Sequence, residues 1–161
     1  MQIIPVECQE FMDLAGMLDE INIPTLRGLS GRAPTFGDHK ALTFGIVKQR
    51  TTQKLALSVA SQKYPEIYEE LVRIGKKFVP FEFTSIHLNK NVVCPRHKDG
   101  GNVGLSCIVA FGDYEGCDLA LETGEIININ CNALIFNGKE VYHWNTPLLS
   151  GTKYSLVYHS K

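Results

Sequence analysis

The second half of the chain consists of many short apolar segments, and this pattern constrains the fold more than any other sequence feature. From Phe81 to His159, turn clusters such as DGGN, GDYEG and NGKE separate the runs FTSIHL, LSCIVAF, DLALE, EIINI, NALIF and YSLVYH. Short apolar runs bounded by Gly, Asn and Asp are typical of strands. So many strands at close spacing predict a sheet closed into a barrel or a double-sheet jelly roll.

The first half of the chain has helical periodicity instead. Apolar residues recur at helical spacing over residues 9–21 and again over residues 53–78, where Pro65 is expected to separate a short helix from a longer one. Residues 24–38 are rich in Gly and Pro and predict a loop, and ALTFGIVKQ after them predicts a strand. We therefore expect an α+β fold with helices of the N-terminal half packed against the β region.

Size and composition are those of one domain. The 161 residues are 44% hydrophobic and 20% charged, enough to bury a core. We expect a single domain over 1–161, in which 1–80 is a helical support region and 81–161 is the main β region. The formal net charge is −1 and the pI is near 6.5, so any nucleic-acid contact must be local. We expect a monomer.

The five cysteines contain no CxxC pair, which predicts neither a disulfide framework nor a cysteine-rich zinc site. We expect reduced thiols and a cytoplasmic or nuclear location. The first residues show no basic segment followed by an apolar run, and no apolar stretch approaches the roughly 20 residues of a membrane span. The sequence therefore predicts a protein that is neither secreted nor bound to a membrane.

The segment VCPRHKDGGN places His97 and Asp99 two residues apart at the end of a predicted strand. In extended chain, alternate side chains share a face, so both side chains point into the same space. Two histidines and one carboxylate form the facial triad of non-haem Fe(II), which leaves coordination positions open. His143, between the run NALIF and the last strand, is the best candidate for the third ligand.

The other histidines are weaker candidates. His39 lies in the polar loop, His87 in the strand before the motif, and His159 at the C-terminal end, where we expect fraying. A histidine two residues before an aspartate also occurs by chance, and a loop histidine beside a turn aspartate remains the alternative.

Lys153 follows His143 by ten residues (153 − 143 = 10) and shares a strand face with Ser155, because Tyr154 and Leu156 alternate with them. A buried lysine needs a partner charge, since an unpaired ammonium group in a core is costly. The carboxylate of a ligand would provide that charge.

These features together resemble the Fe(II)/2-oxoglutarate-dependent oxygenase superfamily, whose fold is a double-stranded β-helix, the cupin-like jelly roll. The resemblance implies that His97, Asp99 and His143 bind Fe(II), that O2 is consumed, and that Lys153 pairs with the distal carboxylate of 2-oxoglutarate, helped by Ser155. Most members have Arg at that position. The pattern His143, Pro147, Gly151, Lys153 is similar to that of the prolyl 4-hydroxylase branch, and lysine makes a single contact rather than a bidentate one.

A second resemblance covers LNKNVVCPRHKDGGNVGLSCIVAFGDYEGCDLAL, in which Asn102 completes HxDxxN. This segment is similar to the TET/JBP family of nucleic-acid base hydroxylases, especially its small microbial and viral members, although Cys117 stands where a glycine is expected. The resemblance implies that the substrate is the methyl group of thymine or 5-methylcytosine in a base outside the stack. It is compatible with an origin in a virus or phage.

Several residues are candidates for contacts around the metal. Asn89, Asn102 and His87 could orient the imidazoles or contact 2-oxoglutarate, although Asn89 and His87 equally suit the surface of an edge strand. Trp144 could stack on a base or pack in the core. Candidates for phosphate contacts, each of which could also be an ordinary solvated charge, are Arg27, Arg32, Lys40, Lys48, Arg50, Lys90 and Arg96.

Three functions remain open at this point: a nucleic-acid base oxygenase, a prolyl-4-hydroxylase-like or small-molecule hydroxylase, and a catalytically idle β-helix that only binds. A zinc hydrolase is disfavoured, because it needs a positioned base near the bound water and the sequence nominates none.

Overall fold

The computed structural model describes residues 1–25 and 40–161. The described helices are α1 (Cys8–Asp19), α2 (Val59–Lys63) and α3 (Pro65–Phe78). The described strands are β1 (Gln2–Pro5), β2 (Lys40–Lys48), β3 (Leu55–Leu57), β4 (Ser85–Lys90), β5 (Val103–Phe111), β6 (Tyr114–Gly116), β7 (Leu119–Leu121), β8 (Ile126–Ile127), β9 (Asn132–Phe136), β10 (His143–Asn145), β11 (Leu148–Gly151) and β12 (Tyr154–Ser160).

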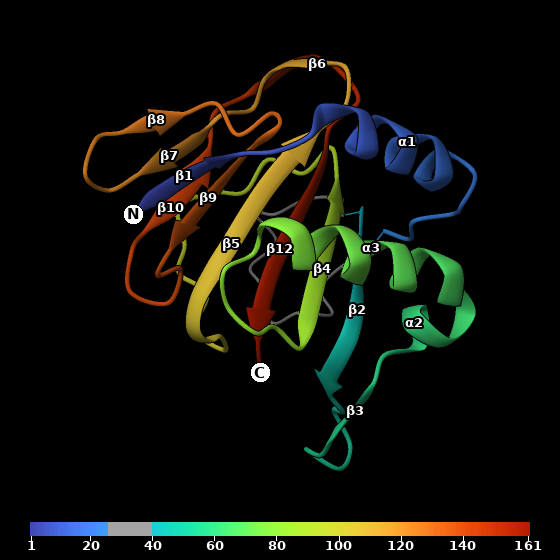
Figure 1. Cartoon of the computed structure of the whole chain (residues 1–161). Coiled ribbons are helices and arrows are strands. Elements are labelled where there is room, and N and C mark those ends of the chain that lie inside the picture. Colours follow the sequence, from blue (N-terminus) through green and yellow to red (C-terminus); the bar gives the residue numbers. More distant parts are fainter. Residues whose placement is uncertain (26–39) are drawn as a thin grey trace.

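The strands form one large sheet and two small ones, and the strand pairs within them are antiparallel. The large sheet has the order β1-β9-β5-β12-β4-β2-β3, and the small sheets have the orders β10-β7-β8 and β11-β6. Strands from the N-terminal part thus occupy both edges of the large sheet. In Figure 1, α1 and α3 lie across one side of this sheet. The expectation of short strands in the second half, with helices packed against them, is confirmed.

Each face of the large sheet has its own apolar cluster. Tyr154, Leu156 and Tyr158 of β12 face the helices, together with Leu14 of α1 and Leu71 of α3. The opposite face packs through Ile108 of β5 and Leu134 of β9 against β7. Because side chains alternate along each strand, the residues between these apolar positions on β4 and β12 are free to build a polar cavity.

The helices begin and end where their residue types favour it. Pro65 occupies the first turn of α3, where its missing N–H costs nothing, and Lys76 and Lys77 lie in the last turn, where they complement the helix dipole. The predicted division at Pro65 is confirmed. The predicted helical start at residue 53 is wrong, because residues 55–57 pair with β2 as strand β3. Backbone pairing outweighs the helical apolar spacing there.

A disulfide joins Cys8, at the start of α1, to Cys131, directly before β9. The expectation that all thiols are reduced is therefore wrong. Sequence inspection could not find this pair, because 123 residues separate its two cysteines. Structural disulfides are rare in reducing compartments such as the cytoplasm and nucleus. The cytoplasmic or nuclear location stays a prediction, and this disulfide is an observation against it.

In the described part of the chain, no helix has the length and apolar character needed to cross a bilayer.

Candidate metal centre and adjoining cavity

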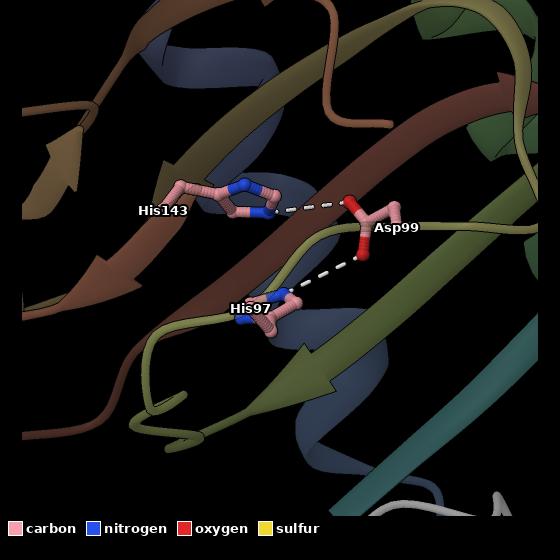
Figure 2. Close-up of side chains that lie close together, drawn as sticks. All are labelled: His97, Asp99 and His143. Atoms are coloured by element: carbon pink, nitrogen blue, oxygen red, sulfur yellow. Dashed lines mark ion pairs between the residues drawn. The ribbon is translucent and has the colours of Figure 1, made fainter. Parts of the chain in front are cut away.

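His97, Asp99 and His143 converge on one point. Their ligand atoms all lie within 4.8 Å of one another. The Nε2 atom of His97 lies 3.4 Å from Oδ1 of Asp99, and the Nε2 atom of His143 lies 3.2 Å from Oδ2. Figure 2 shows both imidazoles directed at the carboxylate, one toward each oxygen. The predicted convergence of these three side chains is thus present in the structure.

Backbone carbonyls orient both imidazoles. Nδ1 of His97 lies 2.7 Å from the Pro95 carbonyl oxygen, and Nδ1 of His143 lies 2.8 Å from that of Val141. A carbonyl only accepts hydrogen bonds, so Nδ1 carries the proton in each ring. Both Nε2 atoms are therefore left as the electron-pair donors that face the shared point, as metal-binding histidines require.

The HxD segment is held by pairing with a distant part of the chain rather than by a strand of its own. Residues 91–102 belong to no named strand, so the prediction of a strand end at this motif is wrong. Instead, His97 and His143 exchange two backbone hydrogen bonds of 3.0 Å, and the Asp99 N–H donates to the Gly138 carbonyl at 2.8 Å. These bonds give the extended geometry that brings both side chains to one side.

Asp99 is held as an anion. Burial by itself would raise its pKa, but the neighbouring imidazoles of His143 and His97 outweigh burial and hold the pKa of Asp99 well below its usual range. The carboxylate is therefore ready to coordinate a cation at neutral pH.

Gly138 is a residue of this centre that sequence inspection did not find. A Cβ atom there would lie 2.9 Å from Oδ2 of Asp99 and 3.5 Å from the Phe136 ring. The sequence marks NGKE as a turn. It does not show that a side chain at Gly138 would clash, because the clash arises from the closeness of this turn to the Asp99 carboxylate.

A cavity of about 340 Å³ adjoins the three ligands. Besides His97, Asp99 and His143, its polar lining residues include Thr43, Lys48, His87, Asn89, Asn102, Asn145, Ser155, His159 and Lys161. Apolar side chains from β5, β7, β9 and β12 complete the wall, among them Ile108, Leu119, Phe136 and Val157. The cavity is therefore continuous from the three ligands to the polar face of β4 and β12.

Asn89, Ser155 and Asn102 line this cavity, and their role in binding a co-substrate stays a prediction. Asn89 and Ser155 lie opposite each other in the β4–β12 ladder, and both are over nine-tenths buried. Asn89 Oδ1 has no hydrogen-bond partner among the described atoms. Asn102 donates to the Ser106 hydroxyl at 3.1 Å, and its backbone N–H donates to the Asp99 carbonyl.

Lys153 is 3% exposed, so the predicted burial is present. Its ammonium group donates to the Cys117 carbonyl oxygen at 2.8 Å, lies 3.3 Å from Cys117 Sγ, and lies 5.7 Å from the centre of the Tyr114 ring. It forms no salt bridge with any carboxylate of the described residues, and it is not among the described residues that line the cavity. Within the described part of the chain, it is therefore a buried cation that no carboxylate balances.

Cys117 has a backbone φ of +52°, in the left-handed region that favours glycine. This conformation explains why a glycine is expected at this position. The cysteine that stands here instead places its sulfur beside the Lys153 ammonium group.

The structure corrects the placement of two histidines. His159 is 4% exposed and lines the cavity from β12, so the expected fraying at the C-terminal end is wrong. Burial lowers the pKa of His159, and the nearby Lys161 lowers it further, so its neutral form is favoured. His87 lines the cavity from β4 rather than lying on an edge-strand surface, and a 3.0 Å hydrogen bond joins its Nδ1 to the Thr43 hydroxyl.

The candidates for substrate contacts lie in different places. Arg27 and Arg32 lie outside the described residues, as does most of the predicted 24–38 loop. Trp144 lines the cavity, and its ring lies 5.3 Å from the Arg96 guanidinium group. Lys48 also lines the cavity.

Sequence comparison finds no relatives: no protein-family model matches this chain. No curated protein matches it either.

Structural comparison does find similar proteins. The structure of NgTET1 in complex with 5mC DNA is 15% identical, with a TM-score of 0.68 over 98% of this chain and 70% of that chain. A 2OG-Fe(II) oxygenase family member from Burkholderia pseudomallei is 13% identical, with a TM-score of 0.63 over 98% and 83%. A prolyl-4-hydroxylase of Pseudomonas putida is 11% identical, with a TM-score of 0.59 over 98% and 90%.

These neighbours are oxygenases of the superfamily that the HxD motif, the distal histidine and the following lysine resemble, and the likeness extends over nearly the whole chain. The resemblance is thereby confirmed at the level of the fold, including the half of the chain where no motif could be matched. The chain has the fold of the Fe(II)- and 2-oxoglutarate-dependent oxygenases, with a His-Asp-His triad at its centre.

Proposed function

We propose that this protein is an Fe(II)- and 2-oxoglutarate-dependent dioxygenase that hydroxylates the methyl group of a pyrimidine base, 5-methylcytosine or thymine, in nucleic acid. The observation that carries the proposal is the triad of His97, Asp99 and His143 at the wall of a cavity, with both Nε2 atoms and the carboxylate directed at one point. We further propose that the sheets form the double-stranded β-helix of this superfamily.

The donor set fits Fe(II). Two neutral imidazole nitrogens and one carboxylate are the ligands of non-haem iron sites that keep positions open for substrates. When bound, iron with 2-oxoglutarate and O2 supplies the oxidising chemistry. The protein's own residues orient the ligands. The carbonyls of Pro95 and Val141 fix the two imidazoles, and the Phe136 ring packs edge-on against the His143 ring, with 5.0 Å between the ring centres.

The polar face of β4 and β12 fits a dicarboxylic acid. Lys153 is buried and pairs with no carboxylate of the described residues, and Ser155, two residues further along the chain, lines the cavity. An uncompensated buried charge is costly, so an incoming carboxylate is favoured. We propose that the Lys153 ammonium group exchanges its contact with the Cys117 carbonyl for the distal carboxylate of 2-oxoglutarate, and that Asn89 lines the path between this group and the metal.

The proposed substrate rests on two observations. The HxDxxN and GDYEGCDL segments resemble those of the TET/JBP family, and the fold is similar to that of NgTET1, whose structure contains 5mC DNA. The three ligands lie at a cavity of about 340 Å³ whose wall is built by strands of the large sheet and of a small sheet, so a base would have to leave the stack to reach the metal.

The test is product analysis. The protein is incubated with Fe(II), 2-oxoglutarate and DNA or RNA that contains thymine or 5-methylcytosine, and the nucleosides are analysed by mass spectrometry. A hydroxymethyl nucleoside that depends on both Fe(II) and 2-oxoglutarate is expected. Asp99→Ala removes the anionic ligand and should abolish metal binding and turnover, whereas Asp13→Ala, an exposed aspartate of α1, should leave both unchanged.

A prolyl-4-hydroxylase-like activity is the second candidate, because the neighbours include prolyl hydroxylases and because Lys153 follows His143 in the pattern of that branch. A proline-rich peptide is therefore included in the same incubation. Unchanged bases beside a hydroxylated peptide would overturn the nucleic-acid substrate. Absence of metal binding and of turnover with every substrate would leave only the idle binding module.

A further inference from the structure

Four side chains surround the two histidine ligands on the outer side of the same backbone pairing. Arg96 and Lys98 flank His97, and Tyr142 and Trp144 flank His143. Since His97 and His143 pair as an antiparallel bridge and side chains alternate along extended chain, their sequence neighbours start on the other side of this pairing, from which Trp144 also reaches the cavity wall. They form one group, which we call the cation–aromatic cluster.

Within the cluster, each cation lies over an aromatic ring. The Lys98 ammonium group lies 4.3 Å from the centre of the Tyr142 ring. The Arg96 guanidinium group lies 4.6 Å from the same ring and 5.3 Å from that of Trp144. The Arg96 side chain is 54% exposed and Tyr142 is 38% exposed, so cations and rings are open to a partner.

The cluster carries local positive charge on a chain whose net charge is −1. Among the described residues, Glu122 is the carboxylate that reaches it, at 3.9 Å from Arg96. Two cations against this one carboxylate leave the cluster positive. Phosphates of a nucleic acid would meet the cations, and exposed aromatic rings offer faces on which unpaired bases stack.

The cluster also adjoins the cavity. Trp144 belongs to the cluster and lines the cavity, and each cluster residue is bonded directly to a histidine ligand, so neighbouring Cα atoms are about 3.8 Å apart. A strand bound on the cluster therefore passes close to the metal centre. Bases in a duplex are paired and stacked and cannot lie on the rings, so the geometry favours a single strand.

We propose that Arg96, Lys98, Tyr142 and Trp144 bind a single-stranded segment of nucleic acid and guide one unstacked base into the cavity. This inference rests on the proposed function for the kind of substrate. It is tested by binding without turnover, so that the two can fail separately.

The experiment measures fluorescence anisotropy of a labelled short oligothymidylate, with Mn(II) in place of Fe(II) and without O2. We expect the single strand to bind more tightly than its duplex with oligodeoxyadenylate. Tyr142→Ala should weaken single-strand binding about tenfold, as expected for the loss of one stacked base. Tyr142→Phe keeps the ring and should bind as the unchanged protein does.

Salt dependence tests the cations. In the double variant Arg96→Gln with Lys98→Gln, the slope of log affinity against log salt concentration should fall by about 1.4, since each phosphate contact on a single strand contributes about 0.7. Lys63→Gln is the matched control, because Lys63, the last residue of α2, also lies over a ring, that of Tyr64, at 5.3 Å from the ring centre. Its slope and affinity should not change. Melting midpoints show whether each variant is folded.

Unchanged affinity and slope in the cluster variants would overturn the inference, as would tighter binding of the duplex. Polyglutamate that competes as well as the oligonucleotide would assign the cluster to acidic proteins instead and would also overturn it. If the cluster variants lose binding but no oxidised nucleoside forms with any variant or with the unchanged protein, the cluster assignment holds and the proposed oxidation fails.

Discussion

Gly138 has no side chain because Asp99 and Phe136 occupy the space that a side chain would need. We predict that Gly138→Ala displaces the carboxylate and lowers metal affinity by about 10- to 100-fold, the usual range for residues that position metal ligands. Titration with Mn(II) measures this. Gly100→Ala is the matched control: it is next to Asp99, but its Cβ would have no atom within 4 Å. Equal affinities of the two variants would contradict the steric argument.

Replacing Lys153 should raise the stability of the ligand-free protein and weaken the binding of 2-oxoglutarate. Lys153→Met removes a buried charge that no carboxylate of the described residues balances, so the ligand-free protein should melt at a higher temperature. The same change should raise the 2-oxoglutarate KM at least tenfold, because a charge-assisted hydrogen bond is lost. Melting scans with and without 2-oxoglutarate, together with kinetics, measure both effects. If the KM stays the same, another group anchors the co-substrate.

At the scale of elements, α3 approaches β12 through a glycine. A Cβ atom on Gly75 would lie 2.3 Å from Cε1 of Tyr158 and 2.9 Å from Cζ of Phe83. We predict that Gly75→Ala destabilises the protein by about 1–3 kcal/mol through overpacking, although alanine favours helix. Gly16→Ala in α1 has nothing within 4 Å and should stabilise by about 0.5–1 kcal/mol. Urea unfolding of both variants measures the two changes in the free energy of unfolding. If helix propensity alone decides them, both variants will be more stable than the unchanged protein.

The disulfide connects α1 to the chain before β9. Under denaturing conditions without reductant, alkylation followed by mass spectrometry should find three thiols, Cys94, Cys107 and Cys117, and five after reduction. Cys8→Ser with Cys131→Ser should lower the free energy of unfolding by at most roughly 4–5 kcal/mol, since the crosslink closes a long loop. Cys94→Ser is the control. Five thiols before reduction would show that the bond does not form.

At the scale of the whole molecule, the large sheet separates two tasks. Its helix-facing side holds the main apolar cluster, and its other side carries the polar groups of the cavity. Burying those polar groups costs free energy, and the packing of the helices on the other face of the sheet offsets that cost. This division places a buried asparagine, Asn89, and the carboxylate of Asp99 on the wall of one cavity.

Metal binding should couple this centre to global stability, in a way that depends on pH. Mn(II) binds the folded state and should raise the melting temperature. Metal ligands must be deprotonated to bind, so the increase should be smaller at acid pH than at neutral pH. Asp99 does not contribute to this loss, because its pKa is held well below its usual range and it stays ionised. Scans with Mn(II) and with a chelator measure the effect; a shift that is independent of pH would contradict histidine ligation.

The sequence alone determined much of the second half of the chain. Strand β9 spans the predicted NALIF, and Lys153 is buried as predicted. The ligand types and their HxD spacing were also visible, because residue chemistry and the alternation of side chains are local properties. Local pattern equally identified the division of the helices at Pro65.

Only the tertiary structure decided which distant residues meet. His143 pairs with His97 across 143 − 97 = 46 residues, and Cys8 bonds to Cys131. Lys153 donates a hydrogen bond to Cys117, and His159 lines the cavity although the sequence predicts a frayed end there. Residues 55–57 are helical in pattern but become a strand, because β2 offers backbone partners. Such contacts depend on the packing of the whole chain, and no short window of sequence contains that information.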